Sequence, residues 1–103
     1  WFVNNAWFQD ENYGHPIGAL FPNAWRLYDM HGNMMEWCHD WYASNYLSGA
    51  QANPQGATTG FGRVLRGGCF ACSSDRTRSA DRHFSDTDTR SHVIGFRVLR
   101  RVP

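Results

Sequence analysis

The chain has 103 residues, of which 42% are hydrophobic and 16% aromatic, and its formal net charge is +1. This length suits one hydrophobic core, so we expect a single domain over residues 1–103. No apolar run approaches the roughly 18 residues of a membrane-spanning helix, so no membrane span is expected, and nothing resembles a signal peptide. Because the chain starts at Trp1, we expect it to be the C-terminal part of a longer polypeptide.

All ten basic side chains are arginine, and nine of them follow position 62, against four aspartates there. A chain without lysine is a poor candidate for binding the phosphate backbone of a nucleic acid, which argues against nucleic-acid partners. The planar guanidinium has five donors that can satisfy backbone carbonyls in a loop-rich fold. We therefore expect the arginines to be structural first.

The first half of the chain predicts short extended pieces and turns. Residues 15–20 read as extended around Pro16, and residues 21–24 turn the chain. Residues 31–33 (HGN) predict a tight turn, because Gly and Asn tolerate positive φ. From position 35, large residues alternate with polar ones, which predicts a central strand with Trp37 and Trp41 in the core.

The second half predicts an exposed connection and two more strands. Residues 43–62 are rich in small and polar side chains, which is typical of an exposed connection. Residues 63–68 predict a strand that ends in a glycine pair, and residues 94–100 predict a closing strand. Residues 69–93 are almost wholly polar and show no pattern that would bury them. All five tryptophans lie at or before position 41, so we expect the first half to supply the bulk of the core, completed by Val64, Leu65, Ile94, Phe96, Val98 and Leu99.

The cysteines and histidines give weak metal signals. Cys38, Cys69 and Cys72 allow either one bridge with a free thiol or three free thiols. The spacing of Cys69 and Cys72 lacks the second ligand pair that zinc needs. His15, His31 and His39 are expected to be structural, and His83 and His92 exposed. Asp86 and Asp88 fall short of the six to eight oxygens that calcium takes, so we predict no metal and no cofactor.

Seven separated blocks then occur in an order that resembles the formylglycine-generating-enzyme (sulfatase-modifying-factor) family, from about residue 15 to 100. The blocks are PNAW (22–25), LYDMHGN (27–33), EWC (36–38), DWY (40–42), RVLRGG (63–68), RSA (78–80) with Arg82, and GFR (95–97). The resemblance implies a C-type lectin-like fold of the α+β class, loop-rich with a small twisted antiparallel sheet. Arg26 departs from the family pattern, which usually has Gly there.

The family's oxidases suggest one function for the chain. They convert a substrate cysteine to formylglycine with a copper ion held by two thiolates after the RGG strand, and Cu(I) favours such soft ligands. Cys72 falls near the place of the first ligand, but the second is missing, and Cys69 stands where the family usually has Ser. A copper-dependent formylglycine-generating oxidase is therefore the alternative, and we expect no catalytic residues.

The variable proteins of diversity-generating retroelements resemble this domain and suggest another function. They place hypervariable residues between the RGG strand and the closing GFR, at positions whose Asn codons are diversified at adenines. This chain has seven Asn between positions 4 and 53 and none afterwards. The resemblance implies that residues 69–93 form a variable ligand-binding segment, between fixed struts Arg78, Ser79, Ala80, Arg82, Asp88 and Arg90.

Fifteen positions in this segment hold residues whose codons can arise from an Asn or Ser codon of the family by substitution of adenines. We call them the exchange positions. They are Cys69, Ala71, Cys72, Ser73, Asp75, Arg76, Asp81, His83, Phe84, Ser85, Asp86, Thr89, Ser91, His92 and Val93. We expect an exposed, fairly flat patch centred on Phe84, Arg76 and the neighbouring aspartates, because aromatic and Arg side chains anchor interfaces. The predicted function is non-catalytic binding of a protein or cell-surface ligand at a virion or cell surface; oligomeric state stays open.

Overall fold

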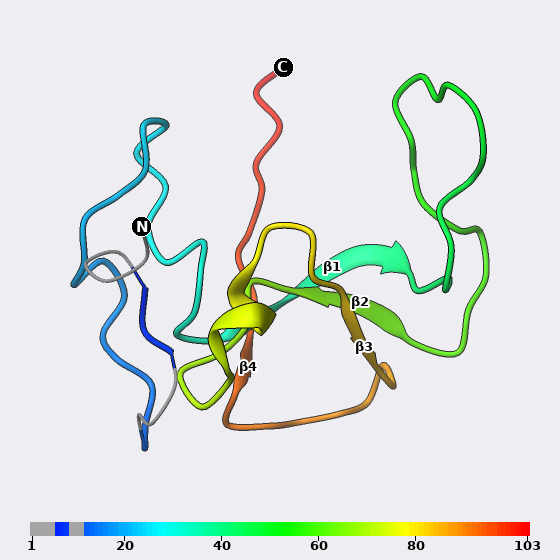
Figure 1. Ribbon diagram of the computed structural model, residues 1–103. Helices are drawn as coiled ribbons and strands as arrows, with labels where there is room; N and C mark the ends of the chain where they lie inside the picture. Colours follow the sequence, from blue (N-terminus) through cyan, green and yellow to red (C-terminus); the bar gives the residue numbers. More distant parts are fainter. Residues whose placement is uncertain (1–5, 9–11) are drawn as a thin grey trace.

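A computed structural model describes residues 6–8 and 12–103. Within them lie β1 (Met35–Trp41), β2 (Arg63–Arg66), the 3-10 helix η1 (Ser74–Thr77), β3 (His83–Ser85) and β4 (Ile94–Gly95). Most of the remaining described chain consists of turns and irregular loops (Figure 1). No helix in the described part of the chain has the length and apolarity to cross a membrane.

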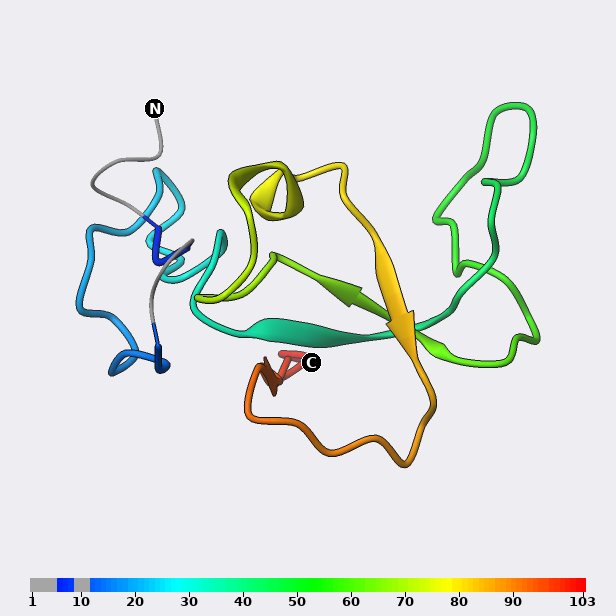
Figure 2. The same ribbon diagram turned by 60° about the horizontal axis from the view of Figure 1, so that its bottom comes forward.

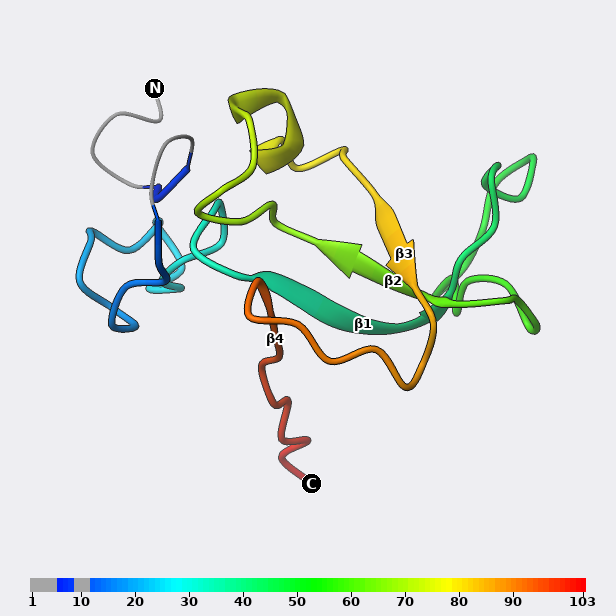
Figure 3. The same cartoon turned by 90° about the horizontal axis from the view of Figure 1, so that it is seen from below.

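The four strands form one sheet in the order β3-β2-β1-β4. β1, β2 and β3 pair antiparallel, as predicted, whereas β4 pairs parallel with β1, so the sheet is mixed. Seen from below, β1, β2 and β3 fan out with changing direction, as a twisted sheet requires (Figure 3). The prediction of a small twisted sheet in a loop-rich fold is confirmed, and the parallel β4 differs from the antiparallel pairing that was expected.

β1 and β2 form the centre of the sheet; β1 was predicted from alternation, and β2 as a strand that ends in a glycine pair. Trp37 pairs with Leu65 and Trp41 with Arg63, with a shift of register between the two pairs. Val64 and Leu65 are only 4% and 3% exposed. The Arg63 guanidinium lies 3.8 Å from the centre of the Trp41 ring, in cation–π contact. The core thus centres on β2, with the partly buried Trp37 and Trp41 of β1 against it.

Residues 31–33 form the predicted tight turn, which connects the N-terminal loops to the residues that follow β2. Gly32 and Asn33 have φ of 84° and 62°. A Cβ on Gly32 would lie 2.1 Å from the Trp7 carbonyl oxygen, so only glycine fits there. The buried Asn33 side chain accepts from the His15 amide at 2.9 Å and donates to the His15 carbonyl at 3.1 Å. This asparagine fastens a loop 18 residues away.

The predicted closing strand over residues 94–100 is wrong beyond Gly95. β4 ends there, and Phe96, Val98 and Leu99, which were expected in the core, are 76%, 86% and 92% exposed. The chain after β4 rises away from the sheet with no strand of the described chain beside it (Figure 1). Strand propensity without a hydrogen-bonding neighbour leaves these side chains in solvent.

Two other predictions differ in part from the structure. Residues 15–20 contain a turn at positions 17–18, with Gly18 at φ 74° and its amide donating to Asp29 Oδ2 at 2.8 Å. Trp25 is 82% exposed, so the tryptophans do not all serve the core, and Trp1 lies outside the described residues. By contrast, the connection over residues 43–62 is largely exposed, as predicted, and forms the long loop at the right of Figure 1.

Candidate binding surface

The segment of residues 69–93 starts with a closed turn rather than an exposed loop. A disulfide joins Cys69 and Cys72, and the Cys72 amide donates to the Cys69 carbonyl at 3.0 Å. Cys69 and Phe70 are 3% and 2% exposed, so the expectation that Cys69 is a surface position is wrong. Gly68, at φ 69°, passes against the Arg76 backbone and directs the next two residues inward. Cys38 is the free cysteine.

η1 is anchored to the scaffold by a residue that the sequence did not single out. Thr77 has no exposed surface; its hydroxyl donates to the Ser74 carbonyl at 2.7 Å, and its own carbonyl lies 2.7 Å from His31 Nδ1. A lone Thr in a polar run carries no periodic signal of burial, which is why it was missed. The segment is therefore packed at Thr77 as well as at its start.

β3 divides the exchange positions between two faces of the sheet. Phe84 pairs with Val64, while His83 and Ser85 pair with Leu65 and Arg63. Because side chains alternate along a strand, Phe84 points to one face and its two neighbours to the other. β3 is an edge strand of the sheet (Figure 2).

The expected single patch around Phe84 and Arg76 is therefore not formed. Phe84 stacks on Tyr42 with ring centres 4.5 Å apart and remains 52% exposed. On the other face, Arg76 Nη1 contacts His83 Nε2, which lies 3.6 Å from Asp81 Oδ2. The structure thus brings Arg76, His83 and Asp81 together and places Phe84 apart from them.

Most exchange positions are at least partly accessible. Asp75, Phe84 and His92 are exposed and His83 is half-buried, so none of these four lies in the interior. Exposed positions are Ala71, Ser73, Asp75, Arg76, Phe84, Asp86 and His92; half-buried positions are Cys72, Asp81, His83, Ser85, Thr89, Ser91 and Val93; Cys69 alone is buried.

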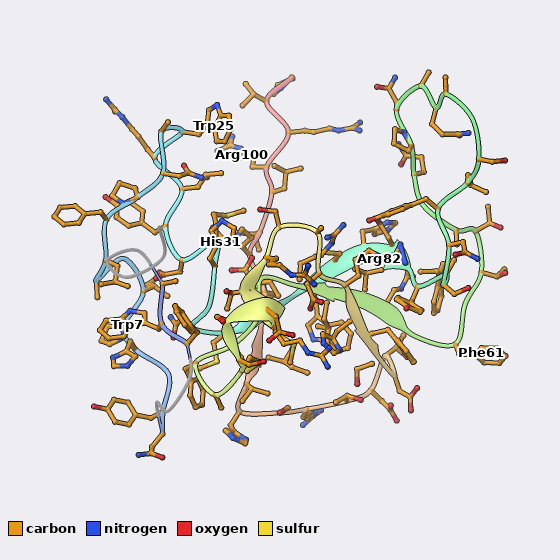
Figure 4. All side chains as sticks on the ribbon, in the orientation of Figure 1. Trp7, Trp25, His31, Phe61, Arg82 and Arg100 are labelled. Carbon is orange, nitrogen blue, oxygen red and sulfur yellow. A yellow bond between two sulfur atoms is a disulfide. The ribbon has the colours of Figure 1, made fainter. Side chains whose placement is uncertain are left out.

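Some of the predicted struts do bind backbone carbonyls. Arg78 Nε donates to the Asp75 carbonyl at 2.8 Å, and Arg82 Nη2 donates to the Ala43 carbonyl, 39 residues away. Figure 4 shows Arg82 lying at the sheet, between the segment and the long connection. Asp88 and Arg90 are exposed and make no described contact, so the strut role predicted for them is not seen.

Arg66 of β2 is a further strut, although the sequence assigned it only to a strand. It donates through Nη1 to the Ser79 carbonyl at 2.8 Å and the Asp81 carbonyl at 3.1 Å. Charge-assisted bonds of this kind hold a backbone in place without using the side chains of the residues they fix. Arg66 therefore holds the Ser79 and Asp81 carbonyls, and Arg82 links the same stretch to Ala43 of the long connection.

Two pKa shifts, one at Cys38 of β1 and one at Asp75 in residues 69–93, have different physical causes. Burial raises the pKa of the Cys38 thiol on β1, and the nearby Asp40 charge raises it further. In the segment, a hydrogen bond from the Ser73 hydroxyl lowers the pKa of Asp75, which is fully exposed. The first shift is mainly a burial effect, and the second is mainly a local hydrogen bond.

The donor set does not fit a copper centre as it stands. Cys72, which falls near the place of the family's first copper ligand, is bonded to Cys69 in a disulfide. A disulfide sulfur is not the thiolate that binds copper. Among the described residues, His, Cys, Asp and Glu side chains form no group of three that could hold a metal ion.

Comparison with known proteins identifies the family. The family described as "Sulfatase-modifying factor enzyme 1-like domain" matches residues 2–102. The serine/threonine-protein kinase pkn1 of Chlamydia pneumoniae is 42% identical over 84 residues, which are 79% of this chain and 14% of that protein. The formylglycine-generating enzyme of Thermomonospora curvata is 35% identical over 89 residues, which are 80% of this chain and 29% of that enzyme.

Two solved structures share the fold. Treponema denticola variable protein 1 superposes with a TM-score of 0.83 at 34% identity, over 90% of this chain and 34% of its own. PvdO from Pseudomonas aeruginosa gives 0.76 at 26% identity, over 90% and 38%. The chain thus spans between about a seventh and two fifths of these relatives. It has a C-type lectin-like fold and belongs to the sulfatase-modifying factor enzyme 1-like (formylglycine-generating-enzyme) family.

Proposed function

We propose that this domain binds a ligand, without catalysis, through diversified side chains of residues 69–93, as a variable protein of a diversity-generating retroelement. The observation that carries the proposal is a division of labour within the segment. Thr77, Cys69 and the arginine-held carbonyls support the backbone, while most exchange positions are exposed or half-buried. A binding loop can vary its side chains only if its stability comes from elsewhere.

The likeness to Treponema denticola variable protein 1 supports the same proposal. The ligand would be a protein or a cell-surface molecule at a virion or cell surface. Because β3 separates Phe84 from Arg76 and His83, we propose two contact areas along this edge of the sheet. One contains the aromatic pair of Phe84 and Tyr42, and the other the polar group around Arg76.

A substitution series tests the division of labour. Ser73, Asp86 and His92 are each changed to Asn, the residue expected before diversification, and Thr77 is changed to Asn as the matched buried control. We expect each exposed change to alter the free energy of unfolding by less than about 0.5 kcal/mol, and Thr77→Asn to cost about 2 kcal/mol or more. Urea denaturation measures both. Equal costs at all four positions would contradict the proposal.

The DNA around the gene provides a second test. A diversified gene is accompanied by a near-identical copy of the stretch that encodes residues 69–93, carrying Asn codons, beside a reverse-transcriptase gene. We expect sequencing of the neighbourhood to find this copy. A complete neighbourhood with neither the copy nor a reverse transcriptase would remove the diversification part of the proposal.

The formylglycine-generating oxidase is a second candidate, because enzymes of that name are 34–37% identical to the chain. An assay with copper and a cysteine-containing peptide separates the two functions. We expect no aldehyde product by mass spectrometry, because the two available thiols are paired with each other. Turnover that is lost in a Cys72→Ser variant would establish the enzyme instead.

A further inference from the structure

A pocket of about 210 Å³ lies on the face of β1 and β2 to which Phe84 also points. Val64 of β2 and Ala43, Leu47, Pro54 and Ala57 of the long connection are its apolar walls, and Trp41, whose ring stacks on Arg63, lines it at the end of β1. A cavity of roughly 150 Å³ is enough to bind benzene. The pocket therefore has room for one group of about the size of an aromatic side chain, and not for a nucleotide cofactor.

Two guanidinium groups, those of Arg66 and Arg82, line the same pocket. Arg66 Nη2 donates to the Tyr46 hydroxyl at 3.1 Å, and its other amino group binds backbone carbonyls. Arg82 binds the Ala43 carbonyl and lies 4.3 Å from the centre of the Tyr46 ring. Both cations are thus held in position before any ligand arrives, which lowers the entropic cost of binding.

The charge of these two cations is not balanced inside the pocket. No carboxylate of the described residues lies within ion-pair distance of Arg66 or Arg82; the described ion pairs are Arg97 with Glu36 and His83 with Asp81. Asp40 is the single carboxylate among the lining residues. Each guanidinium has five donors, and the described bonds of Arg82 use one nitrogen. An anionic group would find free donors beside an apolar wall.

We propose that this pocket binds a carboxylate carried on an apolar or aromatic group, as at the C-terminal residue of a peptide or on an aromatic acid. None of the fifteen exchange positions lines it. The pocket would accept the same chemical group whichever side chains stand at those positions. The inference therefore goes beyond the proposed function and does not depend on it.

Titration with a matched pair of probes tests the charge preference. N-acetylphenylalanine carries the carboxylate, and N-acetylphenylalanine amide has the same shape without the charge. We expect the acid to shift the backbone amide NMR signals of Ala43, Leu47 and Ala57 saturably, with an affinity at least about tenfold above that of the amide. Equal affinities, or shifts elsewhere on the protein, would overturn the proposal.

Two surface variants locate the effect. Leu47→Asp places a negative charge at the pocket on a side chain that is 66% exposed, and Phe61→Asp places one on the same connection at a side chain that is 98% exposed and outside the lining. Figure 4 shows Phe61 pointing away from the molecule. We expect Leu47→Asp to weaken binding of the acid about tenfold more than binding of the amide, which loses only the apolar contact, and Phe61→Asp to change neither affinity. Equal weakening of the acid by both variants would overturn the pocket assignment.

The probe titration can fail or succeed independently of the Asn substitution series that tests the proposed function. If the acid binds no better than the amide while the exposed Asn substitutions remain harmless, the pocket proposal fails alone. If the acid binds as expected while those substitutions unfold the protein, the display of diversified side chains fails alone. Testing the His92→Asn variant with the acid provides the cross-check, and we expect an unchanged affinity because His92 does not line the pocket.

Discussion

Residues 63–70 and residues 71–93 follow each other in the chain but differ in burial. In the first, Val64, Leu65, Cys69 and Phe70 are all less than 5% exposed. In the second, Thr77 is the buried residue and the others are exposed or half-buried. The difference indicates that most of the buried apolar surface that stabilises the fold lies in β2 and the turn after it. The longer stretch is held mainly through its backbone.

The largest expected effect lies in the first stretch. Leu65→Ala removes a side chain that is 3% exposed, and the lost burial together with the cavity should cost about 3 kcal/mol of unfolding free energy. Chemical denaturation measures it. Val98→Ala, at a side chain that is 86% exposed, is the control and should change the free energy by less than about 0.5 kcal/mol. Similar costs at the two sites would break the comparison.

The disulfide at the border of the two stretches should give the next effect. It closes a loop between residues separated by three positions, for which the chain-entropy estimate is about 2 kcal/mol. We expect the Cys69→Ser, Cys72→Ser double variant to unfold at correspondingly lower denaturant. Cys38→Ser, which removes the free thiol, serves as the control. If dithiothreitol leaves the unfolding midpoint of the unsubstituted protein unchanged, the disulfide does not stabilise the fold.

Arg26 provides a test outside both stretches. Its φ of 62° is unfavourable for a residue with a Cβ, so Arg26→Gly should stabilise the protein by about 1 kcal/mol. Gly49 has φ 82° and an open position for a Cβ, so Gly49→Ala should destabilise by a similar amount through the backbone alone. Thermal unfolding measures both. A loss of stability in Arg26→Gly would show that the Arg26 side chain contributes more to stability than the positive φ costs.

The smallest expected effect is a change in the alkylation rate of Cys38 on β1, which compares a charge near this thiol with a charge in residues 71–93. Burial and the Asp40 charge raise the pKa of Cys38, so less thiolate is present at pH 8 than in a free thiol, and alkylation by iodoacetamide should be slow. Asp40→Asn removes one cause, which lowers the pKa and should raise the rate at pH 8. Asp86→Asn removes a distant charge in the exposed segment and should leave the rate unchanged; an equal rise would show a non-local effect.

Features that depend on neighbouring residues could be predicted from the sequence, and features that depend on distant residues could not. The turn at residues 31–33, the strand around Trp37 and the strand ending in Gly67 and Gly68 were predicted correctly, because positive φ and a period of two are properties of the neighbouring residues themselves. The candidate segment was placed by the order of the family blocks. Its mixture of exposed and anchored positions was not predicted, since Thr77 and Cys69 show no pattern that marks them as buried.

The sequence by itself determined the family, the order of the main strands and turns, and the polar character of the segment. The burial of Val64 and Leu65 was predicted, but only the tertiary structure decided which side chains outside the central strands are buried. It turned Cys69 inward, left Phe96, Val98 and Leu99 in solvent, and sent Phe84 and His83 to opposite faces of the sheet. The physical reason is that burial depends on which chain packs against a residue, and composition and alternation do not specify that partner.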